Sequence, residues 1–152
     1  CADTVSICLS KGIGSPAGSV LLLPKALEAK ARRWRKMLGG GMRQAGVIAA
    51  AGIYALENNV NRLKEDQERA EFLAKELNQY TNGSSDQKII QNTNMVFFTP
   101  KETDSQKLLS FLSNKGIIIN EPLPSTRMVM HLDISDNDLN YVVNSFDEYY
   151  NQ

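Results

Sequence analysis

The chain has few of the residues that build metal and disulfide sites. Among its 152 residues are two cysteines and one histidine. Cys1 and Cys8 lie on one extended segment, where their spacing puts them roughly 23 Å apart and excludes a disulfide bond between them. Together with His131 they do not make a zinc site, so we expect no metal and interpret His131 as a hydrogen-bonded structural residue. A chain without a disulfide fits a reducing compartment, and we expect a cytoplasmic protein.

Long hydrophobic runs and an excess of charge of either sign are also absent. No apolar run approaches the roughly 20 residues that a membrane span needs, and no signal peptide is visible. The 17 basic residues balance 17 acidic ones, which argues against a dedicated nucleic-acid binder. We therefore expect neither a membrane nor a nucleic acid among the partners.

What the chain does have is enough apolar sequence for a core and an uneven distribution of charge. Apolar residues make up 42%, and the length fits one ordinary domain or two small lobes. Basic residues cluster near the start and acidic residues near the end, where no basic residue accompanies them. We interpret most of both clusters as solvated helix faces. They are Lys25, Lys30, Arg32, Arg33, Arg35 and Lys36, and Asp133, Asp136, Asp138, Asp147 and Glu148.

The first part of the chain predicts two strands followed by three helices. Alternation with β-branched residues predicts a strand over 4–9, and an apolar run between glycine and proline predicts another over 19–23. A helix begins at Pro24 and ends at the three glycines that start with Gly39. Its expected buried stripe is Leu27, Ala31, Trp34 and Leu38.

The next two helices are expected over 45–58 and 60–80. The first is rich in alanine and glycine, so that it can approach its neighbours closely, and we expect it to be buried or at an interface. The second is amphipathic and is closed by a turn at 82–85, which marks a lobe boundary. The apolar face of this second helix is Leu63, Ala70, Leu73 and Leu77.

Beyond that turn the pattern is typical of a small α/β lobe. Phe146, Tyr149 and Tyr150 are expected to be packing residues. The pattern predicts strands over 95–99, 116–120 and 128–132 and helices over 105–114 and 136–150.

Lys11 stands at the end of the first strand and opens directly into a glycine-rich turn. A P-loop would place the lysine after the glycines and before serine or threonine, and the glycine spacing does not fit G-x-G-x-x-G. Glycines beside a lysine leave room for a flat cofactor close to the backbone. Lysine also forms Schiff bases, and partial burial of a lysine lowers its pKa and makes the amine a nucleophile. The alternative is a surface turn with an incidental lysine.

Several segments in order resemble the low-specificity L-threonine aldolases, pyridoxal-phosphate enzymes of the aspartate aminotransferase fold type. The resemblance implies an α/β fold, with residues 1–59 as the end of the large cofactor-binding domain and 60–152 as a linking helix and a small C-terminal α/β domain. The segments that carry it are SKGIGSPAGS (10–19), RWRKMLGGGMRQAG (33–46), AAAGIYAL (49–56), TNM (93–95) and RMVMHLD (127–133).

The resemblance also implies a role for four residues. Lys11 matches the lysine that holds pyridoxal 5′-phosphate covalently, and Arg127 matches the arginine that grips the substrate carboxylate. Lys36 and Arg43 match basic positions that approach the cofactor phosphate. The implied reaction is cleavage of L-threonine or L-allo-threonine to glycine and acetaldehyde, in threonine catabolism and glycine biosynthesis. The implied assembly is a homotetramer, a dimer of dimers, with the glycines 39–41 near an interface.

The chain also departs from that family. Members are much longer, and the segment that stacks on the cofactor ring and the histidine near the substrate hydroxyl would precede Cys1. We therefore expect a C-terminal portion of the enzyme, inactive on its own. Two alternatives stay open: another enzyme of the same fold, such as a β-eliminating lyase or a hydroxymethyltransferase, and a non-catalytic interaction module that uses the basic helix.

Overall fold

The computed structural model describes residues 2–81, 88–100, 105–119 and 125–151. The chain forms two compact units, Cys1–Arg62 and Leu63–Gln152. The turn expected at 82–85 lies outside the described residues. The lobe boundary expected there is wrong, because the two units divide between Arg62 and Leu63. Within these ranges no helix is both long and apolar enough to cross a membrane, and no cluster of potential metal ligands is present.

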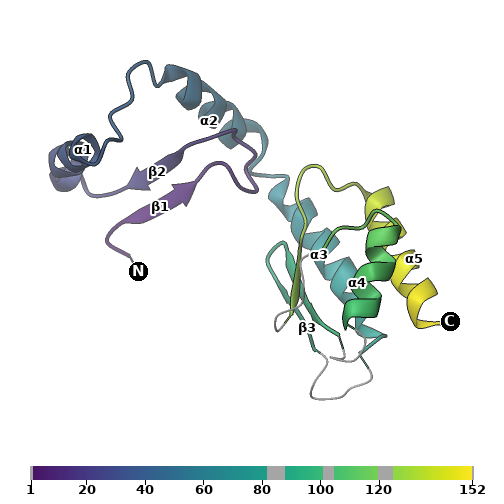
Figure 1. The fold of residues 1–152 in the computed structure, drawn as a ribbon. Helices are drawn as coiled ribbons and strands as arrows, with labels where there is room; N and C mark the ends of the chain where they lie inside the picture. Colours follow the sequence, from purple (N-terminus) through teal and green to yellow (C-terminus); the bar gives the residue numbers. More distant parts are fainter. Residues whose placement is uncertain (1, 82–87, 101–104, 120–124, 152) are drawn as a thin grey trace. The chain divides into compact units, whose positions relative to one another are not determined.

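The first unit is built on a hairpin of two short strands (Figure 1). β1 (Val5–Cys8) and β2 (Ser19–Leu22) pair antiparallel, with Val5 opposite Leu22 and Cys8 opposite Ser19. The strands and helices predicted for this part of the chain are confirmed, except that the first helix is preceded by a short 3-10 turn. The helical segments are η1 (Lys25–Leu27), α1 (Glu28–Met37) and α2 (Gly46–Asn58).

Helix α1 ends where three glycines follow it. Leu38 caps the helix, and Gly39 has a φ of +86°, a conformation that glycine adopts without steric cost. The Gly39 N–H donates to the carbonyl oxygen of Lys36 at 3.2 Å, and the Gly40 N–H donates to that of Arg35 at 2.8 Å. This pair of bonds is the Schellman arrangement, which satisfies carbonyl groups that the last helical turn leaves free. The predicted end of the helix is confirmed.

The stripe expected to be buried on α1 is instead largely exposed. Trp34 is 51% exposed and Leu38 80%, and α1 contains no buried residue. On α2 only Gly52 and Ala55 are buried. Helical spacing predicts which side chains share a face, but burial also needs another element to cover that face. No element in the described part of the chain covers this one.

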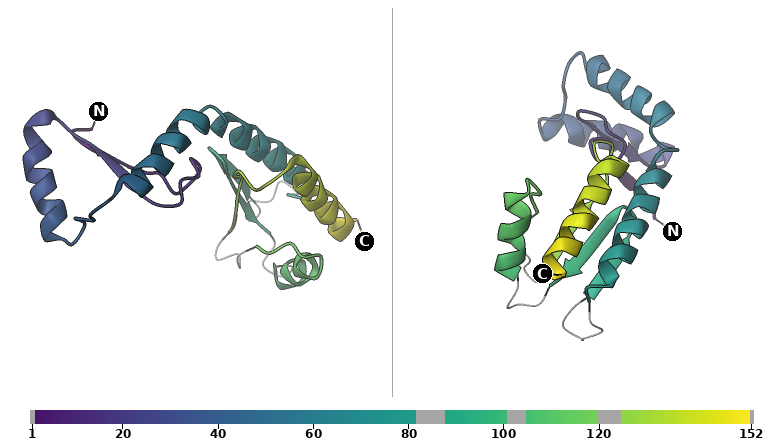
Figure 2. Two further views of the ribbon diagram at one scale, coloured as in Figure 1. Left: turned by 90° about the horizontal axis from the view of Figure 1, so that it is seen from above. Right: turned by 90° about the vertical axis from the view of Figure 1, so that its right-hand side faces the viewer.

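The second unit is a two-layer α/β fold. Its helices α3, α4 and α5 lie on the same side of a three-stranded sheet, with α3 and α5 side by side (Figure 2). The strands pair antiparallel in the order β3-β4-β5. The elements are α3 (Leu63–Asn78), β3 (Lys88–Asn92), β4 (Met95–Thr99), α4 (Ser105–Asn114), β5 (Thr126–Val129) and α5 (Asp136–Tyr150).

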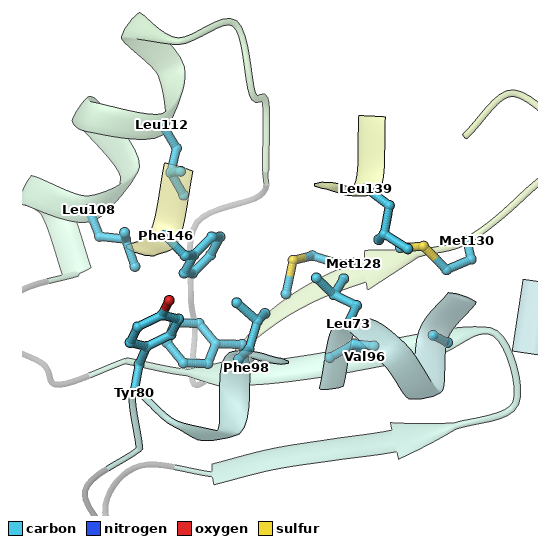
Figure 3. Packing of buried hydrophobic residues seen from close by; sticks show 12 residues of the cluster. Leu73, Tyr80, Val96, Phe98, Leu108, Leu112, Met128, Met130, Leu139 and Phe146 are labelled. Carbon is cyan, nitrogen blue, oxygen red and sulfur yellow. The ribbon is translucent and has the colours of Figure 1, made fainter. Parts of the chain in front are cut away.

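The core of this unit lies between the helices and one face of the sheet (Figure 3). Phe98 on β4 and Met128 on β5 are buried there, and the Phe98 ring meets the Phe146 ring edge to face, with centroids 5.6 Å apart. Burial of a large apolar side chain stabilises a fold by about 2 kcal/mol. The predicted apolar face of α3 is confirmed at Ala70, Leu73 and Leu77, which are buried. The other core residues are Tyr80, Val96, Leu108, Leu112, Met130 and Leu139.

The strands of the second unit differ in part from the prediction. β3 is not predicted, because Ile89 and Ile90 are its only apolar residues and leave no alternation to recognise. The strand predicted over 116–120 is wrong for 116–119, and residue 120 lies outside the described residues. Gly116 has a φ of +76°, and the Ile117 N–H donates to the Leu112 carbonyl at 2.9 Å. This stretch therefore closes α4 instead of beginning a strand. β5 also begins and ends earlier than the predicted 128–132.

The acidic end of the chain has basic partners that lie far away in the sequence. The Nε of Arg69 donates to Asp136 Oδ1 at 2.7 Å, and the Nζ of Lys115 donates to Glu148 Oε2 at 2.6 Å. These pairs join α5 to the rest of its unit. Each contributes little to stability, because both acidic partners are exposed to solvent.

Candidate functional site

Lys11 lies on the connection between β1 and β2. The Leu9 N–H donates to the Gly18 carbonyl at 3.0 Å and continues the pairing of the two strands by one step. Beyond it, the Gly14 N–H donates to the Lys11 carbonyl at 2.8 Å and closes a four-residue turn. Gly14 and Gly18 have φ values of +78° and +113°, so a side chain at either position would strain the backbone.

Helix α2 packs against this connection at two points that fix the turn. A Cβ added to Gly52 would lie 2.9 Å from Leu9 Cδ1, so the helix approaches the strand end more closely than alanine would allow. At the C-terminal end of the helix, the capping residue Asn59 donates from Nδ2 to the Ile13 carbonyl at 2.7 Å. The small residues of α2 therefore serve a close approach, as expected, although most of the helix surface is exposed.

The Lys11 side chain is exposed, and within the described residues it makes no hydrogen bond or ion pair. The partial burial expected for a Schiff-base lysine is thus not found in this chain. Two other basic residues of the unit are engaged, since Lys25 and Arg32 both bind Glu28, at 2.7 and 2.9 Å. A free primary amine on a fixed, glycine-flanked turn is chemically suited to covalent attachment to a carbonyl group.

Cys8 is a neighbour of Lys11 that the sequence does not single out as a site residue. Its thiol is exposed at the end of β1, with Sγ 3.2 Å from Ser10 Oγ. Hydrogen bonds from Ser10 lower the pKa of the Cys8 thiol below its ordinary value, and the positive charge of Lys11 acts in the same direction. The end of β1 therefore carries an exposed thiol whose pKa is lowered, three residues before Lys11 in the sequence.

Lys36 and Arg43 lie on either side of the three glycines. The Lys36 side chain runs over Gly41, where an added Cβ would lie 2.5 Å from Lys36 Cδ and 3.1 Å from its Nζ. Arg43 is exposed and precedes Gln44, whose φ is +50°. No hydrogen bond or ion pair among the described residues engages either basic group, so each is free to bind an anion.

Arg127 belongs to the second unit and lies on β5, opposite Phe97 of β4. Its neighbours Thr126 and Met128 are buried on the helix side of the sheet, whereas Arg127 is exposed and so lies on the opposite, open face. Its guanidinium makes no hydrogen bond or ion pair with another described residue. A free guanidinium on a strand is suited to two-point binding of a carboxylate.

His131 follows β5 and is hydrogen-bonded, as expected. Its Nδ1 accepts a hydrogen bond from the Asp133 N–H at 3.3 Å and lies 3.6 Å from Asp133 Oδ2. The side chain is 46% exposed. The histidine therefore belongs to the turn that leads into α5.

Known proteins similar to this chain include threonine aldolases. It is 44% identical over 137 residues to the low specificity L-threonine aldolase of Escherichia coli K12, over 90% of this chain and 40% of that protein. It is 40% identical over 151 residues to the probable low-specificity L-threonine aldolase 2 of Arabidopsis thaliana, over 97% of this chain and 42% of that protein. The chain thus spans about two fifths of the length of these relatives.

Solved structures of other proteins share the fold of this chain. A proposed L-allo-threonine aldolase of Listeria monocytogenes matches with a TM-score of 0.72 at 20% identity, over 96% of this chain and 44% of that chain. The chain therefore has the α/β fold of the pyridoxal-phosphate-dependent enzymes of fold type I. The family model for beta-eliminating lyases matches residues 1–101. The chain belongs to this family, and its resemblance to the low-specificity L-threonine aldolases is confirmed.

Proposed function

We propose that the protein is a pyridoxal 5′-phosphate-dependent lyase that cleaves L-threonine or L-allo-threonine to glycine and acetaldehyde. The observation that carries the proposal is the unpaired Lys11 amine on a fixed turn, in a chain 44% identical to an aldolase of this kind. Because the chain spans about two fifths of its relatives, the activity is proposed for the whole protein. The chain contributes Lys11, Lys36 and Arg43 to cofactor binding and Arg127 to substrate binding.

Three basic residues of the first unit fit the cofactor. Bound pyridoxal phosphate supplies an electron sink for the bond that breaks at the substrate α-carbon. Lys11 holds it through the free amine, on a turn whose backbone conformation Gly14 and Gly18 make possible. Lys36 and Arg43 bind its phosphate, since each basic group is exposed and free of acidic partners among the described residues.

Arg127 binds the substrate carboxylate. A guanidinium forms two parallel hydrogen bonds with a carboxylate and so fixes its direction as well as its position. Fixing the carboxylate orients the α-carbon, and the orientation decides which of its bonds is broken. For an aldolase this is the bond between the α- and β-carbons.

The proposal also covers the domain organisation, the oligomeric state and the cellular location of the protein. Residues 1–59 form the end of the large cofactor-binding domain and 60–152 the linking helix and the small C-terminal domain. The assembly is a cytoplasmic homotetramer, a dimer of dimers, with the glycines 39–41 near an interface. Large apolar side chains that are exposed on and around α1 and α2 support such an interface, because an interface would remove them from water. They include Trp34, Leu38, Val47, Ile53 and Tyr54.

Borohydride reduction of the full-length protein tests the role of Lys11. Reduction should fix the cofactor to the protein, and peptide mapping should place it on Lys11. Lys11→Ala should abolish the labelled peptide, whereas Lys30→Ala, a change at an exposed lysine of the same unit, should leave it unchanged. Label on any other lysine would show that the assignment is wrong.

A second candidate function is β-elimination on the same site, which the description of the matching family favours. The products separate the two reactions. Cleavage of L-threonine by an aldolase releases glycine and acetaldehyde, whereas elimination releases ammonia and a 2-oxo acid. Release of ammonia without acetaldehyde would favour elimination.

A further inference from the structure

Asn94 lies in the tight turn between β3 and β4 and bonds to the residue that follows β5. Its backbone carbonyl accepts a hydrogen bond from the Met130 N–H at 2.8 Å, and its side-chain Nδ2 donates to the Met130 carbonyl at 2.7 Å. Two bonds between the same two residues are the pattern of a hydrogen-bonded pair in an antiparallel sheet. Here the side-chain amide is the second donor. The pairing of β4 with β5 thus extends one step beyond Met95 and Val129.

The turn that carries Asn94 is itself well held. The Gln91 side-chain amide donates to the Thr93 carbonyl at 2.6 Å, and Thr93 Oγ1 donates to the Asn92 carbonyl at 2.6 Å. Asn94 is half-buried, which limits the conformations open to its side chain. The amide is therefore presented to Met130 from a fixed position.

Hydrogen bonds such as those between Asn94 and Met130 help to set the register of β5 against β4. Within the described ranges it pairs on one side only, with β4, and the strand is four residues long. A slip of one residue would turn Arg127 toward the helix-covered face and Met128 toward solvent, because side chains alternate along a strand. The Nδ2 bond to Met130 favours the observed register, since a slip would move the Met130 carbonyl away from Asn94.

We propose that Asn94 is a positioning residue for Arg127. By bonding both backbone groups of Met130, it fixes β5 in the register that presents the guanidinium on the open face of the sheet, opposite Phe97. Asn94 acts through the strand and makes no contact with the substrate. The inference rests on the proposed function, in which Arg127 binds the substrate carboxylate.

Steady-state kinetics of the full-length enzyme test the inference. Asn94→Ala should raise the KM for L-threonine about tenfold and change kcat less than about twofold, because a misplaced guanidinium weakens substrate binding most. Asn92→Ala is the matched control: Asn92 is an exposed residue of the same hairpin, and its side chain makes no hydrogen bond to another described residue. It should leave both constants unchanged.

A double-mutant cycle shows whether Asn94 acts through Arg127. If it does, the KM of the Asn94→Ala, Arg127→Lys double variant should be close to that of Arg127→Lys alone. Amide exchange in the full-length protein, measured before cofactor and substrate are added, gives a second readout: the β5 amides should exchange faster in Asn94→Ala than in Asn92→Ala.

The outcomes separate the inference from the proposed function. If Arg127→Lys leaves the KM unchanged, the proposed substrate role of Arg127 is wrong. If Arg127→Lys raises the KM but Asn94→Ala does not, or if the two effects on KM multiply independently, the positioning role of Asn94 alone is wrong. A fall in kcat and thermal stability at constant KM would show a purely structural residue and would also overturn the inference.

Discussion

Asn59 donates a hydrogen bond from its side-chain amide to the carbonyl oxygen of Ile13, at 2.7 Å, and so joins the end of α2 to the turn that carries Lys11. The bond is partly buried, and loss of the donor leaves the Ile13 carbonyl without this partner. An unsatisfied buried group costs about 1–3 kcal/mol.

We therefore expect Asn59→Ala to lower the free energy of unfolding by about 1 kcal/mol and to speed amide exchange in the turn at 11–14. Denaturant titration and hydrogen exchange measure the two effects. Asn58→Ala is the control, because the Asn58 side chain bonds only to Tyr54 of its own helix, on the exposed surface. Equal effects of the two substitutions would show that the Asn59 amide does not hold the turn.

Gly41 gives a prediction for the proposed phosphate site. An alanine side chain at this position would lie 2.5 Å from Lys36 Cδ, so the lysine side chain must move. Lysine is flexible, and we expect Gly41→Ala to weaken cofactor binding in the full-length protein with little change in stability. Gly46→Ala is the control, since no atom lies within 4 Å of an added Cβ there. Unchanged cofactor affinity in Gly41→Ala would argue against Lys36 as a phosphate ligand. Equilibrium titration with pyridoxal phosphate is the measurement.

The start of α5 gives a prediction for the pH dependence of stability. Ser135 caps this helix: its Oγ accepts from the Asp138 N–H at 3.2 Å and donates to Asp138 Oδ2 at 2.6 Å. Hydrogen bonds from Ser135 lower the pKa of the Asp138 carboxyl. A carboxyl whose pKa is lowered by folding stabilises the protein above its unfolded pKa of about 4, and this contribution is lost as the pH falls through the folded pKa.

Ser135→Ala should thus destabilise the protein by about 1 kcal/mol near pH 7, and by less below about pH 4, where the protonated carboxyl no longer favours the cap. Urea titrations at both pH values measure the difference. Asn137→Ala, a change at an exposed neighbour in the same turn, should show no such pH dependence. A Ser135→Ala effect that is the same at both pH values would contradict the prediction.

The Cys8 thiol gives a prediction for reactivity. Because hydrogen bonds from Ser10 lower its pKa, alkylation by iodoacetamide should reach half its maximal rate at a lower pH than for a free thiol. Ser10→Ala should raise this midpoint, whereas Ser6→Ala, on the same strand but without a bond to the thiol, should not. The rates are measured in a Cys1→Ser background, so that only Cys8 reacts. An unchanged midpoint in Ser10→Ala would show that this hydrogen bond does not set the pKa.

The sequence predicts best those elements whose signals are local. The observed ends of β4, α4 and α5 are the predicted ones, and the start of α5 carries its own capping residues, Ser135 and Asp138. The sequence wrongly predicts a strand over 116–119 and misses β3, and both errors arise because the signal for a strand is not local. Apolar content favoured Ile117 and its neighbours, but strand formation depends on a partner strand that the local sequence does not reveal.

In the candidate site, too, the sequence reveals residues with a local signal and misses contacts between distant segments. Lys11 and Arg127 stand in recognisable segments, so the sequence can suggest them, together with Lys36 and Arg43. The bonds from Asn59 to Ile13 and from Asn94 to Met130 join residues far apart in the chain and leave no periodic pattern. The burial expected for Trp34 and Lys11 failed because it depends on what covers a surface, which spacing along one element does not specify.

β5 pairs with β4 alone in the described part of the chain, so its other edge has no partner strand there. The open edge of such a strand is a template for aggregation, and a charged residue within the strand opposes it. Arg127 is the only charged residue of β5. An apolar replacement would remove this protection together with the proposed substrate contact. The soluble yield of an Arg127→Leu variant therefore decides whether its lost activity reflects chemistry or precipitation.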